Sequence, residues 1–509
     1  MSAVQRVVKN TGYLYLKMGI TVFFSLWTTR IILNSLGALD FGIYNIVGGA
    51  ILMLSFLNST MTSATQRFMN YAEGEGDDFR QKRIFNISIV LHTIVAILFI
   101  MVLLIAEYPL FHGILNINPD RVLAAKVVYY SMMLSTVVTI MSIPYNAAIN
   151  AHENMKFFAF IGVLEAFLKF GIAYATIYCI GDKLILYGIL MAIIPFVSAA
   201  ILCVYCHRHY EECILSPKQY WDKDLFKQMS SFTGWNFLGS TSSLVGNYGI
   251  GIVLNHFFGT LLNAAQGVAN QINAYLLTFS KTMLRATSPL IAKNEGAGNR
   301  KQMILVSLMA NKYSYFLLAL FAIPAIIEMP FLLSVWLKNV PQWAVVFSRL
   351  LLLQSLLAQS VAVFHTSIAA EGRIANYNKI VVVFDLLPIV STYILFLLGY
   401  PPFMMYIMSI LFMGFGKGGL KIFYMKKNCG MPFSQFLFQV LTPILTTSLI
   451  AALAGVSIVF SFPSGWIRLF EVVCVTTLTF LLAVWGIGMT RRERIELKTI
   501  LVDLGKKVK

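Results

Sequence analysis

The sequence predicts an all-α, polytopic membrane protein, and three observations support this prediction. Of the 509 residues, 58% are apolar and only 12% are charged, whereas a soluble globular protein carries about 25% charged residues. The mean hydropathy is +0.74. Apolar runs of about 20 residues recur along the whole chain, and each is long enough to cross a hydrocarbon core of about 30 Å. Lipid is therefore the expected solvent for most of the surface.

The apolar runs define about 14 candidate transmembrane helices. The first run is too long for the apolar core of a signal peptide, so we interpret it as an uncleaved span. The first six spans lie near residues 11–36, 41–65, 84–106, 122–148, 157–180 and 184–206. The others lie near 230–256, 262–288, 304–327, 343–370, 379–400, 403–424, 438–460 and 467–489.

The net charge is +17, and the positive residues are distributed along the chain as a membrane topology predicts. Cations gather in alternate short loops, which is the pattern of the positive-inside rule and not of a nucleic-acid-binding face. If the N-terminus is cytoplasmic, the outside loops hold only Arg121, Lys183, Lys338 and Arg468. An even number of spans then places both termini in the cytoplasm.

Two halves of the chain resemble each other at a constant spacing of 222 residues, which is the difference between residue numbers 233 and 11. This spacing relates Thr11-Gly12 to Thr233-Gly234, Gly37 to Gly259, Ala64-Thr65 to Ala286-Thr287, and residues 73–76 to 295–298. The repeat predicts two parallel six-helix bundles with an appended C-terminal helix pair. In transporters built from such repeats, the substrate site lies between the halves near mid-membrane.

The repeat and the loops together predict five parts. They are an N-terminal bundle over 1–206, a cytoplasmic linker over 207–231, a C-terminal bundle over 232–428, two extra helices over 429–489 and a basic cytoplasmic tail over 490–509.

Ionisable residues within the spans are the main candidates for a functional site, because each costs about 2.5–3.5 kcal/mol at a helix centre. Cations predominate, and a cavity that they line would favour an anion such as phosphate or pyrophosphate. The candidate headgroup contacts are Arg30, Lys17, Lys281, Arg285 and Arg349. The alternative for several of them is interfacial: Arg30 and Arg349 can reach the outer interface, and Lys281 with Arg285 the inner one. We expect Lys417 and Lys421, near the inner end of their span, to snorkel to the interface.

Two acids, Glu165 and Asp385, lie in the spans 220 residues apart. Intramembrane carboxylates suit coupling to a proton or a sodium ion, so both are coupling candidates. The alternative is structural: Glu165 pairs with Lys169, four residues on, or either acid pairs with a lysine of another helix.

No pattern in the chain predicts an enzyme, a cofactor or a metal site. Cys203-Val204-Tyr205-Cys206-His207 matches a haem-attachment string, but the predicted topology places it at the cytoplasmic end of a span. We therefore interpret it as half-buried cysteines beside a basic loop. No glycine-rich phosphate loop or nucleophile elbow is present, and the six cysteines show no paired framework.

Several stretches are similar to the bacterial polysaccharide-repeat flippases, the O-antigen and capsule translocases of the multidrug/oligosaccharidyl-lipid/polysaccharide exporter superfamily. They are Asn10-Thr11-Gly12, residues 36–44 (LGALDFGIY) and Asn150-Ala151-His152-Glu153. The resemblance covers nearly the whole chain. It implies a flippase that moves undecaprenyl-pyrophosphate-linked oligosaccharide from the cytoplasmic to the periplasmic leaflet of the bacterial inner membrane by alternating access. The lipid tail would stay among the membrane lipids while the headgroup crosses.

Three other functions stay open at the level of sequence. A lipid II flippase shares the helix plan and a cationic cavity. A multidrug or cation antiporter shares the superfamily fold, but the excess of cations argues against it. A membrane-embedded polymerase or ligase would need a larger outside loop than the sequence provides. The sequence also leaves open the sugar, the coupling ion, and whether a polymerase and a chain-length regulator act as partners.

Overall fold

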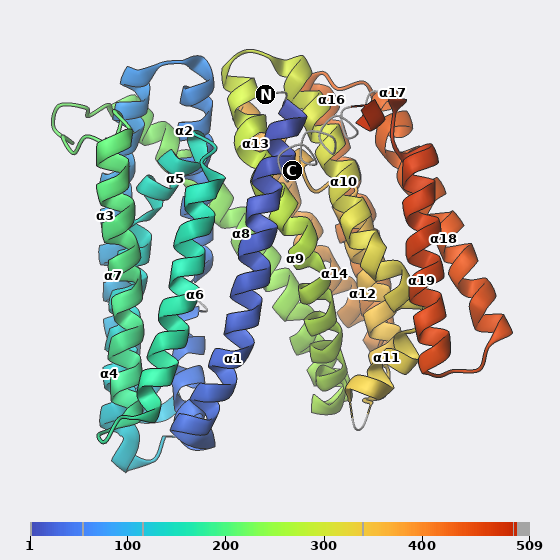
Figure 1. The fold of residues 1–509 in the computed structure, drawn as a ribbon, viewed down its shortest axis with the longest axis horizontal. Helices are drawn as coiled ribbons and strands as arrows, with labels where there is room; N and C mark the ends of the chain where they lie inside the picture. The colour runs from blue at the N-terminus through green and yellow to red at the C-terminus, as the bar shows by residue number, and fades with distance from the viewer. Residues whose placement is uncertain (1–2, 53–54, 115–116, 338–339, 492, 496–509) are drawn as a thin grey trace, which may run out of the picture. The chain divides into compact units, whose positions relative to one another are not determined.

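A computed structural model describes residues 3–52, 55–114, 117–337, 340–491 and 493–495 (Figure 1). Some side chains within the helices, including that of Arg30, lie outside the described part, as do Lys338 and most of the predicted basic tail. Every regular element in the described part is a helix. The prediction of an all-α fold is therefore confirmed.

The chain forms two compact units, Lys9–Phe237 and Leu238–Lys509, the latter joined by Met1–Val8. The first unit holds the helices α1 (Ala3–Leu52), α2 (Ser55–Glu75), α3 (Asp78–Pro109), η1 (Leu110–Ile114), η2 (Pro119–Arg121), α4 (Val122–Met141), α5 (Ile143–Ala151), α6 (Met155–Ile177) and α7 (Lys183–His209). We call it the N-unit and the other the C-unit. The division falls inside α8, so the limits predicted for the five parts stay predictions.

The C-unit contains the remaining helices. They are most of α8 (Lys223–Phe258), then α9 (Thr260–Gly296), α10 (Arg300–Ile327), α11 (Met329–Trp336), α12 (Ala344–Gln359), α13 (Phe364–Glu371), α14 (Ala375–Leu397), α15 (Met404–Ser409), η3 (Ile410–Gly416), α16 (Lys417–Cys429), α17 (Phe433–Phe436), η4 (Leu437–Leu441), α18 (Thr442–Ser461), α19 (Trp466–Ala483) and η5 (Val484–Gly488).

Ten helical segments in the described part are long and apolar enough to cross a membrane, or eleven if α12 and α13 form one bent span. The protein is therefore a multi-pass membrane protein. The three other predicted spans, 11–36, 41–65 and 262–288, fall on α1, α2 and α9, which are helical but not among these segments. Fourteen spans stays a prediction.

The repeat appears in the backbone of both units. Gly37 and Gly259 have φ angles of 77° and 75°, and Gly76 and Gly298 both have a φ of 70°. Only glycine adopts such angles without a steric penalty. Gly37 bends α1 and Gly259 separates α8 from α9. The predicted spans 11–36 and 41–65 meet within α1 at Gly37, where a kink joins them in place of a loop.

The helix that follows each of the second glycines begins in the same way. Asp77 accepts a hydrogen bond from the N–H of Arg80 at 2.9 Å, and Asn299 accepts one from the N–H of Gln302 at 3.2 Å. Each side chain satisfies a backbone donor that the first helical turn leaves unpaired. The two units therefore share the capped turn that joins α2 to α3 and α9 to α10.

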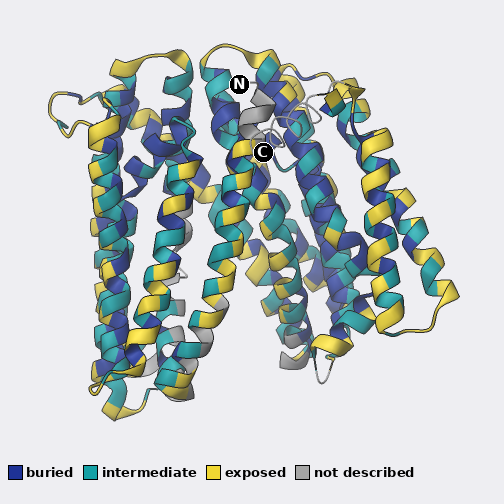
Figure 2. Cartoon of the chain, viewed as in Figure 1, coloured by how far each residue is buried: buried dark blue, intermediate teal, exposed yellow. Residues whose placement is uncertain are grey.

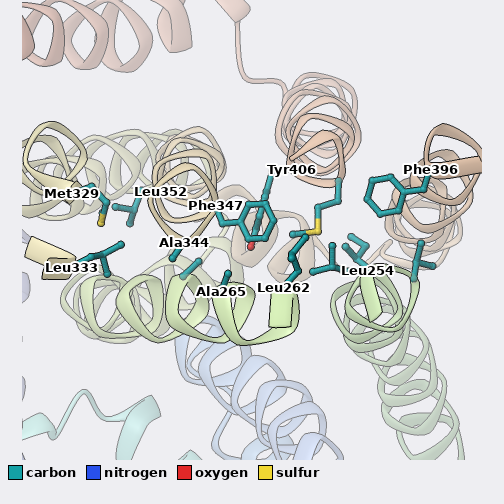
Figure 3. Packing of buried hydrophobic residues seen from close by; sticks show 14 residues of the cluster. Leu254, Leu262, Ala265, Met329, Leu333, Ala344, Phe347, Leu352, Phe396 and Tyr406 are labelled. Carbon is teal, nitrogen blue, oxygen red and sulfur yellow. The ribbon is translucent and has the colours of Figure 1, made fainter. Parts of the chain in front are cut away.

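The C-unit is built around a buried apolar cluster to which α8, α9, α12 and α14 contribute (Figure 3). Leu254, Leu333 and Phe347 are completely buried there. By contrast, many large apolar side chains elsewhere on the helices are exposed (Figure 2). Ile105, Leu453 and Phe470 are each more than 60% exposed, as expected for surfaces that contact lipid tails.

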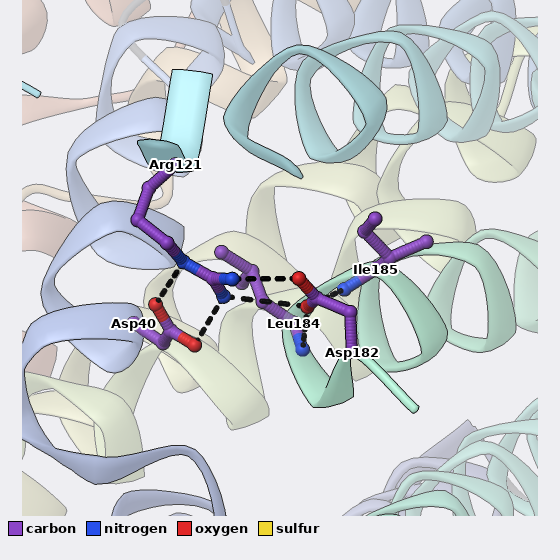
Figure 4. A network of polar contacts seen from close by, with 5 residues as sticks. All are labelled: Asp40, Arg121, Asp182, Leu184 and Ile185. Carbon is purple, nitrogen blue, oxygen red and sulfur yellow. Dashed lines mark hydrogen bonds and ion pairs between the residues drawn. The ribbon is translucent and has the colours of Figure 1, made fainter. Parts of the chain in front are cut away.

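A polar network closes one end of the N-unit (Figure 4). Arg121 forms a two-pronged contact with Asp40 of α1, and its Nη1 donates to Asp182 at 2.6 Å. Asp182 also caps α7 by accepting from the N–H groups of Leu184 and Ile185 at 3.0 and 3.1 Å. Desolvation on its own would raise the pKa of Asp182, but the hydrogen bonds from Arg121 and Ile185 hold that pKa below its usual value. The network ties α1, α4 and α7 together.

The appended helix pair, α18 and α19, packs on α10 of the C-unit. Arg468 of α19 forms an ion pair of 2.8 Å with Glu328, which is fully buried at the end of α10. Close packing supports the contact, because a Cβ on Gly455 would lie 2.4 Å from Thr476 and 2.6 Å from Ile327.

The chain beyond η5 is fastened to the same helix. Lys312 of α10, only 2% exposed, forms an ion pair of 2.8 Å with Glu493. The Glu493 carboxylate also accepts from the N–H of Thr490 at 2.7 Å, while the Thr490 hydroxyl accepts from the N–H of Glu493 at 3.3 Å. This reciprocal arrangement is a capping box, which satisfies two backbone donors at a helix start. One carboxylate thus caps the tail and neutralises a buried lysine.

Candidate functional site

Lys17 of α1 lies against α6 in the N-unit. Its Nζ lies 4.2 Å from the centre of the Phe158 ring, over its face. Its aliphatic chain occupies the space that Gly162 leaves, since a Cβ on Gly162 would lie 1.9 Å from Cε of Lys17. Phe158 and Gly162 are one turn apart, so one face of α6 receives the lysine. Partial burial against an aromatic ring holds the ammonium by a cation–π contact within the membrane region.

Glu165, on the same face of α6, follows Gly162 by three residues. That spacing corresponds to about 4.5 Å along the helix axis. The side chain is half-buried, and no hydrogen bond or ion pair links it to another described residue. The expected alternative, a pair with Lys169, is absent from the described contacts, and Lys169 is exposed. Lys17 and Glu165 therefore give the N-unit a lysine and an acid along one helix face.

The other headgroup candidates differ in what surrounds them. Arg30 lies in α1, but its side chain is outside the described part of the chain. Lys281 and Arg285 are both exposed on α9, one turn apart and on one face. Lys281 makes no hydrogen bond or ion pair with any described residue.

The guanidinium of Arg349 binds backbone carbonyls at the end of α10. Its Nε donates to the carbonyl of Ile326 at 2.8 Å and its Nη2 to the carbonyl of Ile327 at 3.1 Å. These carbonyls belong to the last turn of α10 and have no partner within the helix. The geometry favours a helix-capping role for Arg349, in which two of its five N–H donors bind backbone carbonyls.

Asp385 forms the most strongly connected site among the candidates. It is fully buried in α14, and its Oδ1 accepts from Nζ of Lys417 at 2.6 Å. Its Oδ2 accepts from the hydroxyls of Ser242 and Ser243 on α8 at 3.1 and 2.8 Å. The carboxylate therefore has a cation on one oxygen and two neutral donors on the other. This is the structural alternative considered for the acids, a pair between helices.

The expectation that Lys417 snorkels to the interface is wrong. Its ammonium points to Asp385 and also lies 3.5 Å from the hydroxyl of Ser243. In the membrane interior, an ion pair satisfies an ammonium at a lower cost than exposure to lipid, so the nearest buried carboxylate wins over the interface.

Sequence reasoning anticipated a lysine of another helix as a partner for Asp385 but did not identify Lys417, because 32 residues separate the two. One signal in the sequence could have found it. Glycines allow the partner helices to approach α14 closely, as a Cβ on Gly246 would lie 2.7 Å from the Asp385 carbonyl oxygen and one on Gly416 would lie 2.6 Å from the Phe384 ring.

The cysteine and histidine stretch near residue 206 forms ordinary packing contacts. Cys206 is buried and donates to the carbonyl of Tyr145 at 3.6 Å, and His209 stacks on Tyr205. In the part of the chain that the structure describes, no group of three or more His, Cys, Asp or Glu side chains is placed to hold a metal ion.

Comparisons with known proteins agree with this architecture. The family described as "Polysaccharide biosynthesis protein" matches residues 7–295, which is 289 of the 509 residues. No curated protein matches the sequence.

Solved structures of MATE transporters have the same fold. "Crystal structure of MATE in the bent conformation" is similar with a TM-score of 0.71 at 14% identity, over 84% of this chain and 97% of that chain. "Crystal structure of MATE in complex with MaD3S" has a TM-score of 0.69 at 13% identity, over 85% and 96%. A MOP superfamily transporter from Pyrococcus furiosus, described as having a binding pocket of reverse polarity, has a TM-score of 0.61 at 12% identity, over 97% of this chain and 96% of that chain.

Proposed function

Because the chain belongs to the polysaccharide biosynthesis protein family and has the fold of the MATE transporters, we propose that it is a flippase for undecaprenyl-pyrophosphate-linked oligosaccharide. It would carry repeat units from the cytoplasmic to the periplasmic leaflet of the inner membrane by alternating access, with both termini in the cytoplasm. It would act as a transporter and catalyse no bond making or breaking.

The observation that carries the proposal is the excess of cations over acids in the membrane helices. Lys281 and Arg285 lie exposed on one face of α9, and Lys17 is held on α6 by an aromatic ring. Like charges one turn apart repel each other by a few tenths of a kcal/mol, so an anion that neutralises both is favoured. A pyrophosphate headgroup supplies that anion. We propose Lys17, Arg30, Lys281 and Arg285 as its contacts and assign Arg349 to helix capping.

For coupling to a proton or a sodium ion, Glu165 is the stronger candidate. Its carboxylate has no ion pair within the described residues, so an ion can bind it without first displacing another group. Asp385 already has Lys417 as its cation, and an ion could bind there only after that ammonium had moved.

The experiment is a deletion of the gene followed by analysis of lipid-linked sugars on each leaflet. The proposal expects complete repeat units on the cytoplasmic face and loss of the surface polymer. Single units on the periplasmic face would instead indicate a polymerase, and unchanged lipid-linked sugars with new drug sensitivity a multidrug exporter. Either of those results would refute the proposal.

Complementation with variants tests the headgroup contacts. Lys281→Gln combined with Arg285→Gln should abolish export, while the matched control Lys301→Gln, an exposed lysine in the first turn of α10, should restore it. Export that survives neutralisation of Lys17, Arg30, Lys281 and Arg285 together would show that this assignment is wrong.

In proteoliposomes, Glu165→Gln should remove the dependence of transport on an imposed pH or sodium gradient. Wild-type transport that ignores both gradients would exclude the coupling role of Glu165.

A further inference from the structure

A histidine at one end of the N-unit bridges two segments that are far apart in the sequence. His152 directly follows α5. Its Nε2 lies 2.8 Å from Oε1 of Glu212, in the chain between α7 and α8, and its Nδ1 lies 3.5 Å from Oε1 of Glu73, near the end of α2. We call residues 210–222 the linker. One imidazole ring therefore connects α2 with the start of the linker.

The two carboxylates favour the charged form of the His152 ring. A neutral imidazole has one N–H and can donate to one acceptor, whereas an imidazolium donates from both nitrogens. Opposite charges nearby also favour the protonated ring. The ring stacks on that of Tyr210, with centroids 4.1 Å apart and planes inclined by 10°, which keeps both nitrogens directed at the acids. Protonated His152 thus satisfies both carboxylates, and neutral His152 only one.

Glu212 depends on this contact more than Glu73 does. The Glu212 side chain is 7% exposed, and the His152 ring is its one hydrogen-bond partner among the described residues. A buried carboxylate without a compensating charge is costly, so deprotonation of His152 favours a position of Glu212 closer to water. Glu73 also accepts a hydrogen bond from Gln81 of α3 at 3.2 Å. The linker is therefore the segment that should move.

The other groups around this contact keep their charge near neutral pH. Burial raises the pKa of Tyr210, so this phenol stays neutral between about pH 5 and 8, where a histidine titrates. Glu153, the next residue in the chain, is a carboxyl group, which titrates at more acid pH. Further along the linker, Asn86 donates to the carbonyl of Ile214 at 2.8 Å. Among these groups, only His152 changes its charge near neutral pH.

The C-unit makes the corresponding connection with a permanent cation. Glu295, the repeat counterpart of Glu73, forms an ion pair with Arg300. Nη1 of Arg300 also donates to the carbonyl of Asn428 at 3.1 Å. Asn428 lies at the end of α16, which completes the sixth predicted span of its half as α7 does in the other half. Because an arginine always stays charged, this connection is permanent in the C-unit and titratable in the N-unit.

We propose that His152 is a pH-dependent latch, which holds the start of the linker on the N-unit when it is protonated and releases it as the pH rises through the titration of the histidine. The linker leads into α8, whose first residues belong to the N-unit and whose later residues belong to the C-unit. The latch therefore sets how firmly the beginning of α8 is held. The predicted topology places this end in the cytoplasm, so cytoplasmic pH is the signal, whichever substrate the protein carries.

Hydrogen–deuterium exchange of the purified full-length protein in detergent tests the latch at about pH 6 and about pH 8.5, on either side of the ordinary titration of histidine. Intrinsic exchange depends on pH equally in all variants, so the wild type and each variant are compared at the same pH. His152→Gln removes the charge, and His152→Arg makes it permanent, as in the C-unit. The matched control is Arg300→Gln, followed on peptides that cover the end of α16.

The reporting amides belong to Tyr210 and Cys213, which donate to the carbonyls of Cys206 and Tyr210. At the lower pH these amides should exchange about tenfold more slowly in the wild type than in His152→Gln, the loss that corresponds to one charge-assisted hydrogen bond. At the higher pH the two proteins should exchange alike. His152→Arg should stay protected at both pH values, and the effect of Arg300→Gln should be the same at both.

A ratio of wild-type to His152→Gln exchange that is equal at the two pH values would show a purely structural contact and overturn the latch. Loss of protection in His152→Arg at the higher pH would overturn it as well. Glu212→Gln provides a second variant in case His152→Gln does not fold, which size-exclusion chromatography checks. Its linker should lose protection at the lower pH and match the wild type at the higher pH, and any other pattern would contradict the pairing.

Discussion

The ion pair between Lys312 and Glu493 allows a quantitative test of how the C-terminal segment is attached. Glu493→Gln removes the negative charge but keeps an amide that can still complete the capping box with Thr490. The substitution therefore isolates the charge of the carboxylate. It leaves the ammonium of Lys312, which is 2% exposed, without its counter-charge.

The expected cost follows from the burial of the pair. Breaking a buried ion pair by removing one partner costs about 3–5 kcal/mol, because the other charge stays desolvated. Lys312→Met in the same chain removes that charge as well, and replacing both charges by groups of similar size is about neutral. The single variant should therefore be much less stable than the double variant.

Thermal unfolding in detergent, followed by fluorescence-detected size exclusion, measures the difference. Glu493→Gln should lower the apparent Tm by more than about 5 °C, since 1 kcal/mol corresponds to about 2–4 °C for units of this size. The double variant should recover most of the loss. The control is Arg80→Ala, whose ion pair with Glu75 has both side chains partly exposed, at 34% and 27%, and should cost less than about 1 kcal/mol. A double variant no more stable than Glu493→Gln would refute the reasoning.

Three further predictions concern stability. Gly259→Ala forces a side chain onto a φ of 75° and should lower the folding stability by about 1–3 kcal/mol. The control Gly234→Ala, with open space around it, should cost little stability. Equal melting temperatures of the two variants would contradict this prediction. Arg349→Met strands the two α10 carbonyls that it caps and should cost about 1–3 kcal/mol in the same assay, and an unchanged Tm would disprove the capping role. Because the pKa of Asp182 is lowered in the folded state, its contribution to folding stability is complete above about pH 4 and is lost as the pH falls through the lowered pKa. Asp182→Asn should therefore reduce the loss of stability with falling pH in that window. An identical pH profile of stability in the variant would show that the carboxylate contributes nothing.

Much of the fold could be predicted from the sequence because membrane burial imposes one simple rule. A chain in lipid must satisfy its backbone within each segment, so long apolar runs become helices. The repeat was also visible, since Gly37 and Gly259 are needed for their backbone angles and not for their side chains. The joint between the first two spans was placed correctly at Gly37, but its form was not predicted, because a glycine bend and a short loop leave the same sequence pattern.

The candidate sites were harder to predict, since they depend on which helix faces meet. Periodicity placed Asp385 in a span but could not identify Lys417 as its partner, because nothing local links residues so far apart. Arg349 looked like a ligand for an anion, whereas the nearest acceptors turned out to be carbonyls of α10. In each case an intramembrane charge is satisfied by whatever acceptor is in reach, and the sequence of one helix does not reveal its neighbours.

The paired glycines have a consequence for how this protein can change over evolutionary time. A bend that is encoded by the absence of a side chain does not depend on which apolar residues surround it. Most positions in the helices can therefore drift among leucine, isoleucine, valine and phenylalanine without loss of the architecture, while a few glycines and helix caps cannot. Such a chain keeps its shape long after its sequence has ceased to resemble that of its structural relatives.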